Sequence, residues 1–188
     1  MITPLHPRSG LPEHYPFDYE RRITLNDGRV VHTRPVVPGD AVLLGEEAGK
    51  ADTDTLYQRF FNPAIRLGNG RLRHLTELDY ETRFAIAVFA DGEGIAIARF
   101  EPAGDGLAEI AIVVKPAWRS LGLGTALFDL LELAALERGV KELEAFYLPD
   151  NHAIERVLAK RGFTGAAVDS GVTRVGKILG VPLRSAAT

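Results

Sequence analysis

The segment 113–137 constrains the fold more than any other part of this sequence. An apolar run ends at Pro116, a loop with two glycines follows, and a stretch of helical pattern then reaches Glu137. Apolar residues in this stretch recur three and four positions apart, so they share one face of a predicted helix; they are Leu123, Ala126, Leu127, Leu130, Leu131 and Ala134. A strand that leads through a short loop into a long amphipathic helix is typical of folds that mix strands and helices.

The chain before this helix has the pattern of antiparallel strands. Asn26-Asp27-Gly28 separates two short β-prone runs, 21–25 and 29–34, and predicts a hairpin. Three later apolar runs are joined by turns rich in Gly and Asp, which predicts a meander; the runs are 84–89, 95–100 and 108–114. Helical segments are predicted between the hairpin and the meander; they span 40–49, then from Asp52 or Asp54 to Pro63, with a short one near Leu72.

Gly139 ends the long helix, and the pattern predicts four further elements beyond it. These are a strand over 141–147, a helix from Asp150 or Asn151 to Arg161, and two strands around Ser170-Gly171. A strand, a long helix and a second strand form a right-handed crossover, which makes the two strands parallel. We therefore expect one α/β domain over 21–188, with a mixed sheet whose first half is antiparallel, and a Pro-rich arm over 1–20.

Composition and charge exclude several classes of protein. The chain has no cysteine, which excludes disulfides, thiolate metal sites and cysteine nucleophiles. A formal net charge of -3 gives no global basic field for nucleic acid or an anionic membrane. Residues 1–19 have no apolar stretch typical of a secretory signal, and no window approaches the run of about 20 apolar residues that a membrane span needs. We expect a cytoplasmic protein without a metal site, either monomer or homodimer.

The loop from Arg119 to Thr125 is predicted to bind an anion. Backbone N–H groups at a helix start have no partner within the helix, and the helix dipole adds partial positive charge there. Gly122 and Gly124 let the backbone approach a bulky diphosphate closely, and Arg119 can add a charge-assisted contact. A nucleotide P-loop is excluded because no Gly-Lys-Ser/Thr is present. A dinucleotide fingerprint is disfavoured because the third glycine is missing. A tight connection with glycines needed only for packing is the alternative.

Two stretches of the chain resemble one known family. Arg119-x-x-Gly122-x-Gly124 after a strand resembles motif A of the GCN5-related N-acetyltransferases, and Asn151 to Gly162-Phe163 resembles that family's second conserved stretch, with the same spacing. The resemblance covers about residues 30–175. It implies the acyl-CoA N-acyltransferase fold, in which a parallel strand pair splays apart at the coenzyme site, and acetyl-CoA as the cosubstrate.

The acceptor and the coenzyme-binding residues follow from the same resemblance. Segments 54–61 and 96–100 are similar to bacterial protein lysine acetyltransferase domains, which implies a protein lysine as acceptor, with small amines as competing substrates. The family implies that β-strand backbone contacts the pantetheine arm and that the loop binds the diphosphate. Asn151 is expected either to bond the pantetheine or thioester side or simply to cap its helix. The implied binding residues are Ile112, Val113, Val114, Arg119, Ser120, Leu121, Gly122, Leu123, Gly124, Thr125 and Asn151.

Glu109 is the candidate general base. It is the one acidic residue in the apolar run 107–114, and a carboxylate there costs free energy unless it is paired or solvated in a cleft. Partial burial would raise its pKa, which suits a base near neutral pH. A lysine acceptor, with a reference pKa of about 10.4, must lose a proton before it attacks a thioester. The alternative is that Glu109 faces solvent or pairs with Arg99.

The sequence departs from the family at one position. Many members carry a tyrosine seven residues after the Asn as general acid, and Leu158 stands there in this chain. A coenzyme A thiol is acidic enough to leave without strict acid help. Tyr147 is the candidate substitute, with packing as its alternative role. A non-catalytic module that binds acyl-CoA as a sensor is the second interpretation of the chain.

Overall fold

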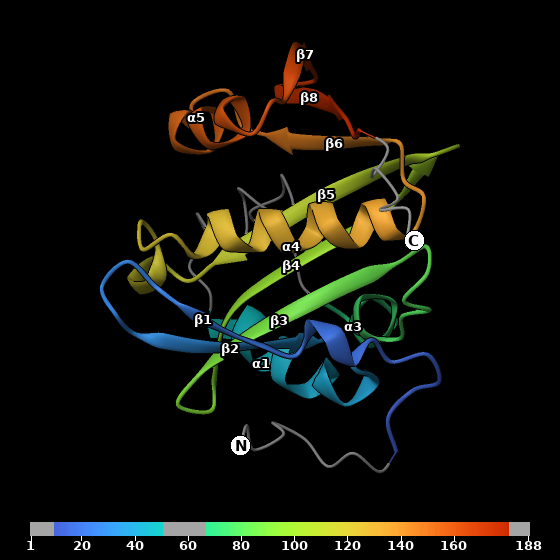
Figure 1. Cartoon of the computed structure of the whole chain (residues 1–188), viewed down its shortest axis with the longest axis vertical. Helices are drawn as coiled ribbons and strands as arrows, with labels where there is room; N and C mark the ends of the chain where they lie inside the picture. Colours follow the sequence, from blue (N-terminus) through green and yellow to red (C-terminus); the bar gives the residue numbers. More distant parts are fainter. Residues whose placement is uncertain (1–9, 51–66, 181–188) are drawn as a thin grey trace, which may run out of the picture.

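One mixed sheet forms the centre of the molecule (Figure 1). The computed structural model describes residues 10–50 and 67–180. Eight strands lie in the order β1-β2-β3-β4-β5-β6-β8-β7. In chain order they are β1 (Arg21–Thr24), β2 (Val30–Pro35), β3 (Phe84–Ala90), β4 (Glu93–Gly104), β5 (Leu107–Val114), β6 (Glu142–Tyr147), β7 (Thr164–Asp169) and β8 (Val172–Ile178).

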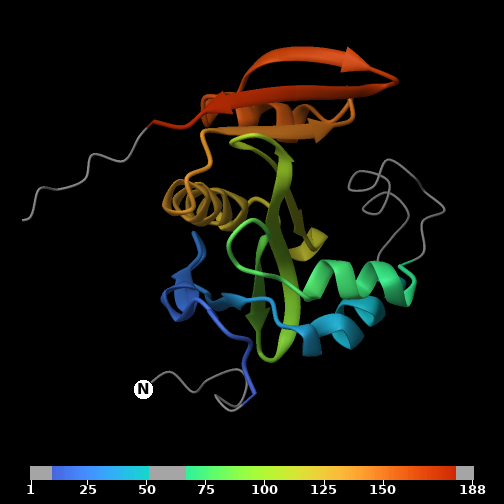
Figure 2. The same ribbon diagram turned by 90° about the vertical axis from the view of Figure 1, so that its right-hand side faces the viewer.

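Helices cover both faces of this sheet. Figure 2 shows α4 on one side of the central strands and α1 and α3 on the other. The α-helices are α1 (Ala41–Lys50), α3 (Asn69–Thr76), α4 (Leu123–Glu137) and α5 (His152–Lys160); short 3-10 turns are η1 (Phe17–Tyr19), η2 (Pro38–Asp40) and η3 (Pro116–Trp118). Within the described ranges, no helix is both long and apolar enough to cross a membrane.

The strand pairing confirms the expected fold class. Each neighbouring pair is antiparallel except β5 and β6, which are parallel. The parallel ladder runs from Leu107↔Glu142 to Ile110↔Ala145 and ends there. On its other side β5 stays paired with β4 as far as Val114. The second half of β5 therefore continues beyond its last pair with β6, and this is where the sheet opens.

The predicted elements agree with the structure in kind and order. The helix predicted from Asp52 or Asp54 to Pro63 lies outside the described residues. The strand predicted over 95–100 is longer, because its pairing with β5 continues past Pro102 to Gly104 through an irregularity in the register. Pro102 interrupts the sequence pattern but not the sheet, since a proline is tolerated at such a bulge.

The main core lies between the sheet and α4. Leu123, Leu127 and Leu131 on the predicted apolar face of the helix are fully buried, together with Phe84 and Phe100 from the sheet. Burying a side chain of this size stabilises a fold by roughly 1.5–3 kcal/mol. The apolar stripe of α4 therefore holds the helix, and with it the loop that precedes it, against the strands.

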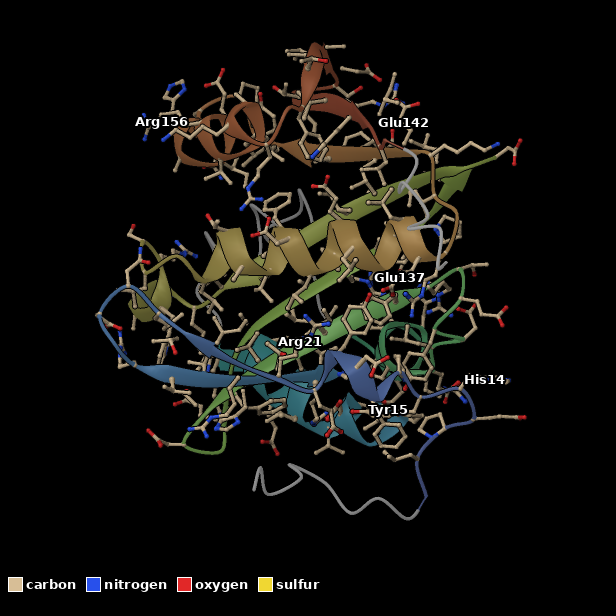
Figure 3. All side chains as sticks on the ribbon, viewed as in Figure 1. His14, Tyr15, Arg21, Glu137, Glu142 and Arg156 are labelled. Atoms are coloured by element: carbon tan, nitrogen blue, oxygen red, sulfur yellow. The ribbon has the colours of Figure 1, made fainter. Side chains whose placement is uncertain are left out.

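Part of the predicted arm packs into this core. Tyr15 and Tyr19 are buried, and the Tyr19 hydroxyl donates a 2.6 Å hydrogen bond to Glu137 Oε2. Figure 3 shows Glu137 at the end of α4 and Tyr15 on the arm below it. These contacts fasten the arm to the C-terminal end of α4, away from the loop at its N-terminal end.

Candidate active site

A groove opens where β5 and β6 diverge. Its volume is about 410 Å³, and its walls come from β5, the loop before α4, the end of β6 and the first part of α5. We call it the splay groove. Among the residues singled out from the sequence, those that line it are Glu109, Ile112, Val113, Val114, Arg119, Ser120, Gly122, Gly124, Thr125 and Asn151. Residues distant in sequence are thus brought to one surface.

Leu121 and Leu123 contribute to this region differently. Leu123 is fully buried, and the partly buried Leu121 packs against the core, so both side chains are used in packing. A contact with an anion from these two positions would come from the backbone N–H groups. Leucines that pack into the core, Leu121 and Leu123, thus alternate with glycines that line the groove, Gly122 and Gly124. This alternation anchors the loop and leaves its backbone facing the groove.

The loop of residues 119–125, here called the phosphate loop, has a specific backbone. Ser120 and Gly122 both have positive φ, at 61° and 84°. The positive φ of Gly122 favours glycine; a Cβ there would also lie 2.9 Å from Oδ1 of the exposed Asn26 side chain, which would have to move aside. At Gly124 a Cβ would meet nothing within 4 Å. The two glycines thus have different roles: Gly122 forms the turn, and Gly124 leaves open space at the start of the helix.

The β1–β2 hairpin holds the phosphate loop from behind. The Asn26 N–H donates a 3.0 Å hydrogen bond to the Leu121 carbonyl. The Arg29 guanidinium lies over the Trp118 ring at 4.1 Å and also binds Asp27, with an Nε to Oδ2 distance of 2.7 Å. Sequence reasoning found the turn at Asn26 but missed its contact with the loop, because nothing local to the turn indicates which distant segment it meets.

Arg119 links the phosphate loop to β5. Its Nε donates a 3.0 Å hydrogen bond to the Val114 carbonyl, and its side chain is exposed. The contact places a positive charge at the junction between the strand and the loop. An anion on the loop would therefore meet both backbone amides and a guanidinium.

The opposite wall is α5, which is fastened to α4. The Asn151 Oδ1 accepts a 3.2 Å hydrogen bond from the Ile154 N–H, which confirms that Asn151 caps α5. At the other end of α5, Arg161 donates a 3.0 Å bond to the Thr125 carbonyl and forms an ion pair with Asp129. Asn151 therefore caps the N-terminal end of this wall, and Arg161 fixes its C-terminal end to α4.

Glu109 lies in a row of carboxylates across three strands. It is in register with Glu101 on β4 and with Glu144 on β6, so the three side chains share one face of the sheet. Glu101 pairs with Arg99, and Glu144 accepts a 2.6 Å bond from Arg174 Nε. Burial would raise the pKa of Glu101, but Arg99 and His74 outweigh it and hold that pKa below its ordinary value.

A second cavity of about 630 Å³ lies on the side of the sheet that α1 and α3 cover. We call it the α1 cavity. Leu43, Leu75 and Phe89 line it, and Arg99 reaches it from β4. Val113 lines both this cavity and the splay groove, so the end of β5 separates the two spaces.

Tyr147 and Leu158 complete the splay groove. Both line it, and both are buried, with 6% and 2% of their surfaces exposed. Burial, and secondarily the negative charge of Glu155, raise the pKa of the Tyr147 phenol. Leu158, at the position where the family often has tyrosine, is thus a buried aliphatic side chain, and the phenol of Tyr147 lies in the same groove.

The fold and groove agree with what sequence comparison shows. The model of the acetyltransferase (GNAT) family matches residues 51–163. The chain therefore belongs to the GNAT acetyltransferase family, whose cosubstrate is acetyl-CoA.

Several members of this family are similar to the chain in sequence or structure. Acetyltransferase Pat of Mycolicibacterium smegmatis is 30% identical over 154 residues, 80% of this chain and 46% of the relative, so the chain spans about half of that protein. The crystal structure of the GNAT domain of S. lividans PAT is 30% identical, with a TM-score of 0.82, covering 88% of this chain and 100% of that one. A cAMP-binding acyltransferase from Mycobacterium smegmatis is 27% identical, with a TM-score of 0.58, covering 88% of this chain and 50% of that one.

Proposed function

We propose that this chain transfers the acetyl group of acetyl-CoA, held in the splay groove, to the side-chain amine of a protein lysine. The observation that carries the proposal is that the β5–β6 ladder ends at Ile110↔Ala145, directly before a groove that leads to the phosphate loop. In this arrangement the backbone of Ile112, Val113 and Val114 contacts the pantetheine arm. Open space at Gly124 admits the diphosphate, and Arg119 contributes charge.

The presence of two separate cavities supports separate binding places for the two substrates. Acetyl-CoA supplies an activated acyl thioester. The acceptor amine enters from the α1 cavity, and the end of β5 at Val113 is the shared wall across which the two meet. Holding both reactants in one geometry converts a bimolecular reaction into an effectively unimolecular one. Backbone N–H groups at the end of β5 polarise the carbonyl.

Glu109 is the proposed general base. It lies on the same strand as Val113, four residues earlier and therefore on the same face, and it lines the splay groove. Glu109 accepts a proton from the amine, so that the nitrogen lone pair can attack.

A small-molecule amine is the second candidate acceptor. The volume of the α1 cavity, about 630 Å³, lies within the range of roughly 300–1,000 Å³ typical of small-molecule sites. A lysine side chain and a free amine share the same reacting group, so the two candidates use the same chemistry.

The test is an acceptor panel combined with Glu109→Gln. Protein and peptide lysines, polyamines and amino acids are offered with acetyl-CoA, and product is followed by mass spectrometry. We expect lysine acetylation, and a fall in kcat/KM for Glu109→Gln of about 100- to 10,000-fold with acetyl-CoA binding retained. Asp105→Asn, which removes an acidic charge from the exposed β4–β5 turn, is the matched control. Binding of acetyl-CoA without transfer to any acceptor would favour the sensor interpretation instead.

A further inference from the structure

Acetyl transfer leaves a sulfur atom that must gain a proton, and the following inference rests on the proposed function. A C–N bond forms, the C–S bond breaks, and its electron pair stays on sulfur. A thiol of the cysteine type has a pKa of about 8.5, so most of the product near neutral pH carries a proton on sulfur. Glu109 is assigned to take a proton from the amine. A second group in the groove would assist the departure of the thiol by giving a proton to the sulfur, although the thiol does not strictly require it.

Three hydroxyl-bearing side chains line the splay groove: Ser120, Thr125 and Tyr147. Ser120 and Thr125 belong to the phosphate loop and are exposed, so they lie at the diphosphate end. Tyr147 is the last residue of β6, two positions beyond Ala145, where the ladder with β5 ends. Residues two apart on a strand share a face, so Tyr147 continues the row of Ala145 into the opening between the strands.

The Tyr147 hydroxyl has no structural task in the fold. The hydroxyls of Tyr15, Tyr19 and Tyr80 donate to Glu20, Glu137 and the Val36 carbonyl. Within the described part of the chain, the Tyr147 hydroxyl makes no hydrogen bond, and it is not among the polar atoms sealed from solvent without a partner. Tyr147 is thus a buried residue, 6% exposed, that lines the groove with a hydroxyl that is not sealed from solvent.

The surroundings of Tyr147 keep this hydroxyl protonated. Its ring packs in the cluster that includes Phe128, Leu158 and Phe163. Burial first, and then the charge of Glu155, raise its pKa, so the phenol is neutral at physiological pH and has a proton to give. Leu158, on the helix that forms the other wall, offers only hydrocarbon.

We propose that Tyr147 donates its proton to the sulfur of coenzyme A as the C–S bond breaks. The nitrogen loses its second proton to water as the amide forms, and the phenolate regains a proton from that water. Glu109 releases to solvent the proton that it took from the ammonium group. The sum leaves both side chains as they began and yields a thiol and an amide. In this assignment β6 supplies the acid and β5 the base, one from each strand of the diverging pair.

The binding test compares coenzyme A with desulfo-coenzyme A, which lacks the sulfur, by titration calorimetry. We expect the wild-type protein to bind coenzyme A about 2- to 12-fold more tightly, the range of one ordinary hydrogen bond, and Tyr147→Phe to remove this preference. Tyr19→Phe is the control, because it also deletes a buried hydroxyl but at the opposite end of α4. The control should keep the wild-type ratio.

Kinetics supply the second readout. Tyr147→Phe should lower kcat by about tenfold or more, the low end of general acid catalysis because a thiol leaves readily, while the KM for acetyl-CoA changes less than about twofold. An unchanged ratio of coenzyme A to desulfo-coenzyme A affinity in Tyr147→Phe overturns the assignment and leaves the proposed function intact. Failure of the wild-type protein to bind either compound overturns the proposed function itself.

Discussion

The two ends of the splay groove are built on different principles. At the phosphate-loop end, contacts would come from main-chain N–H groups at the start of α4, and the side chains of Leu121 and Leu123 only anchor that backbone. At the other end, here called the reaction end, Glu109 and Tyr147 line the groove, and we propose that the chemistry depends on their side chains. The first end is local in sequence, whereas the second joins residues from different strands. Changes at the two ends should therefore separate binding from turnover.

The largest expected effect is on stability at the reaction end. Glu101→Gln removes the carboxylate that pairs with the buried Arg99; because Glu101 itself is one-third exposed, the free energy of unfolding should fall by about 1.5–3 kcal/mol at neutral pH, as for a hydrogen bond to a charged group. Thermal or denaturant unfolding measures this. A loss below about 0.5 kcal/mol would contradict a structural role for the carboxylate row.

The same variant has a defined pH dependence. The folded pKa of Glu101 lies below its ordinary value of 4.5, so its ionised form contributes stability above that value and loses it as pH falls through the lower, folded pKa. The difference between wild type and Glu101→Gln should therefore shrink on acidification below about pH 4.5. A stability difference that grows in acid would mean that the folded state raises the pKa of Glu101 instead of lowering it.

Next in size is Gly122→Ala at the phosphate-loop end. The φ of 84° opposes a Cβ, which would also displace the exposed Asn26 side chain, so we expect a loss of about 1–3 kcal/mol in unfolding free energy and weaker binding of acetyl-CoA. Gly139→Ala, also at positive φ but with open space around it, controls for conformation alone and should cost less.

Gly124→Ala should instead affect binding alone. A Cβ there meets no protein atom and alanine favours a helix, so stability should hold or rise slightly. The added methyl projects into the space assigned to the diphosphate, so the Kd for acetyl-CoA should rise by about tenfold, a change of about 1.4 kcal/mol. Calorimetry measures this, and unaltered affinity would show that the diphosphate lies elsewhere.

The smallest effect is expected from Arg29→Ala in the hairpin. It removes an exposed cation–π contact with Trp118, which is typically worth about 0.5–1 kcal/mol. Because the hairpin supports the loop from behind, the KM for acetyl-CoA should rise a few-fold while kcat stays within about twofold of wild type. A drop in kcat with unchanged KM would indicate that the hairpin acts on the reaction end.

The comparison of the two ends also explains what could be predicted from sequence. The phosphate loop is readable because a strand, glycines and an amphipathic helix are consecutive, and the structure forms the turn at the predicted Gly122. The hold of Asn26 and Arg29 on this loop could not be foreseen, because it is a tertiary contact across nearly a hundred residues. The row of Glu101, Glu109 and Glu144 depends on strand register. A short turn links β4 to β5, but the register of β6 against β5 could not be foreseen, because a long helix separates these two strands in the chain.

Binding of acetyl-CoA followed by backbone amide NMR tests the central claim most directly. We predict that saturating acetyl-CoA produces its largest amide shifts in residues 112–114 and 120–125, in the end of β6 and in the start of α5. Amide signals elsewhere should shift less. Shifts confined to residues that line only the α1 cavity, with the phosphate loop unperturbed, would contradict it.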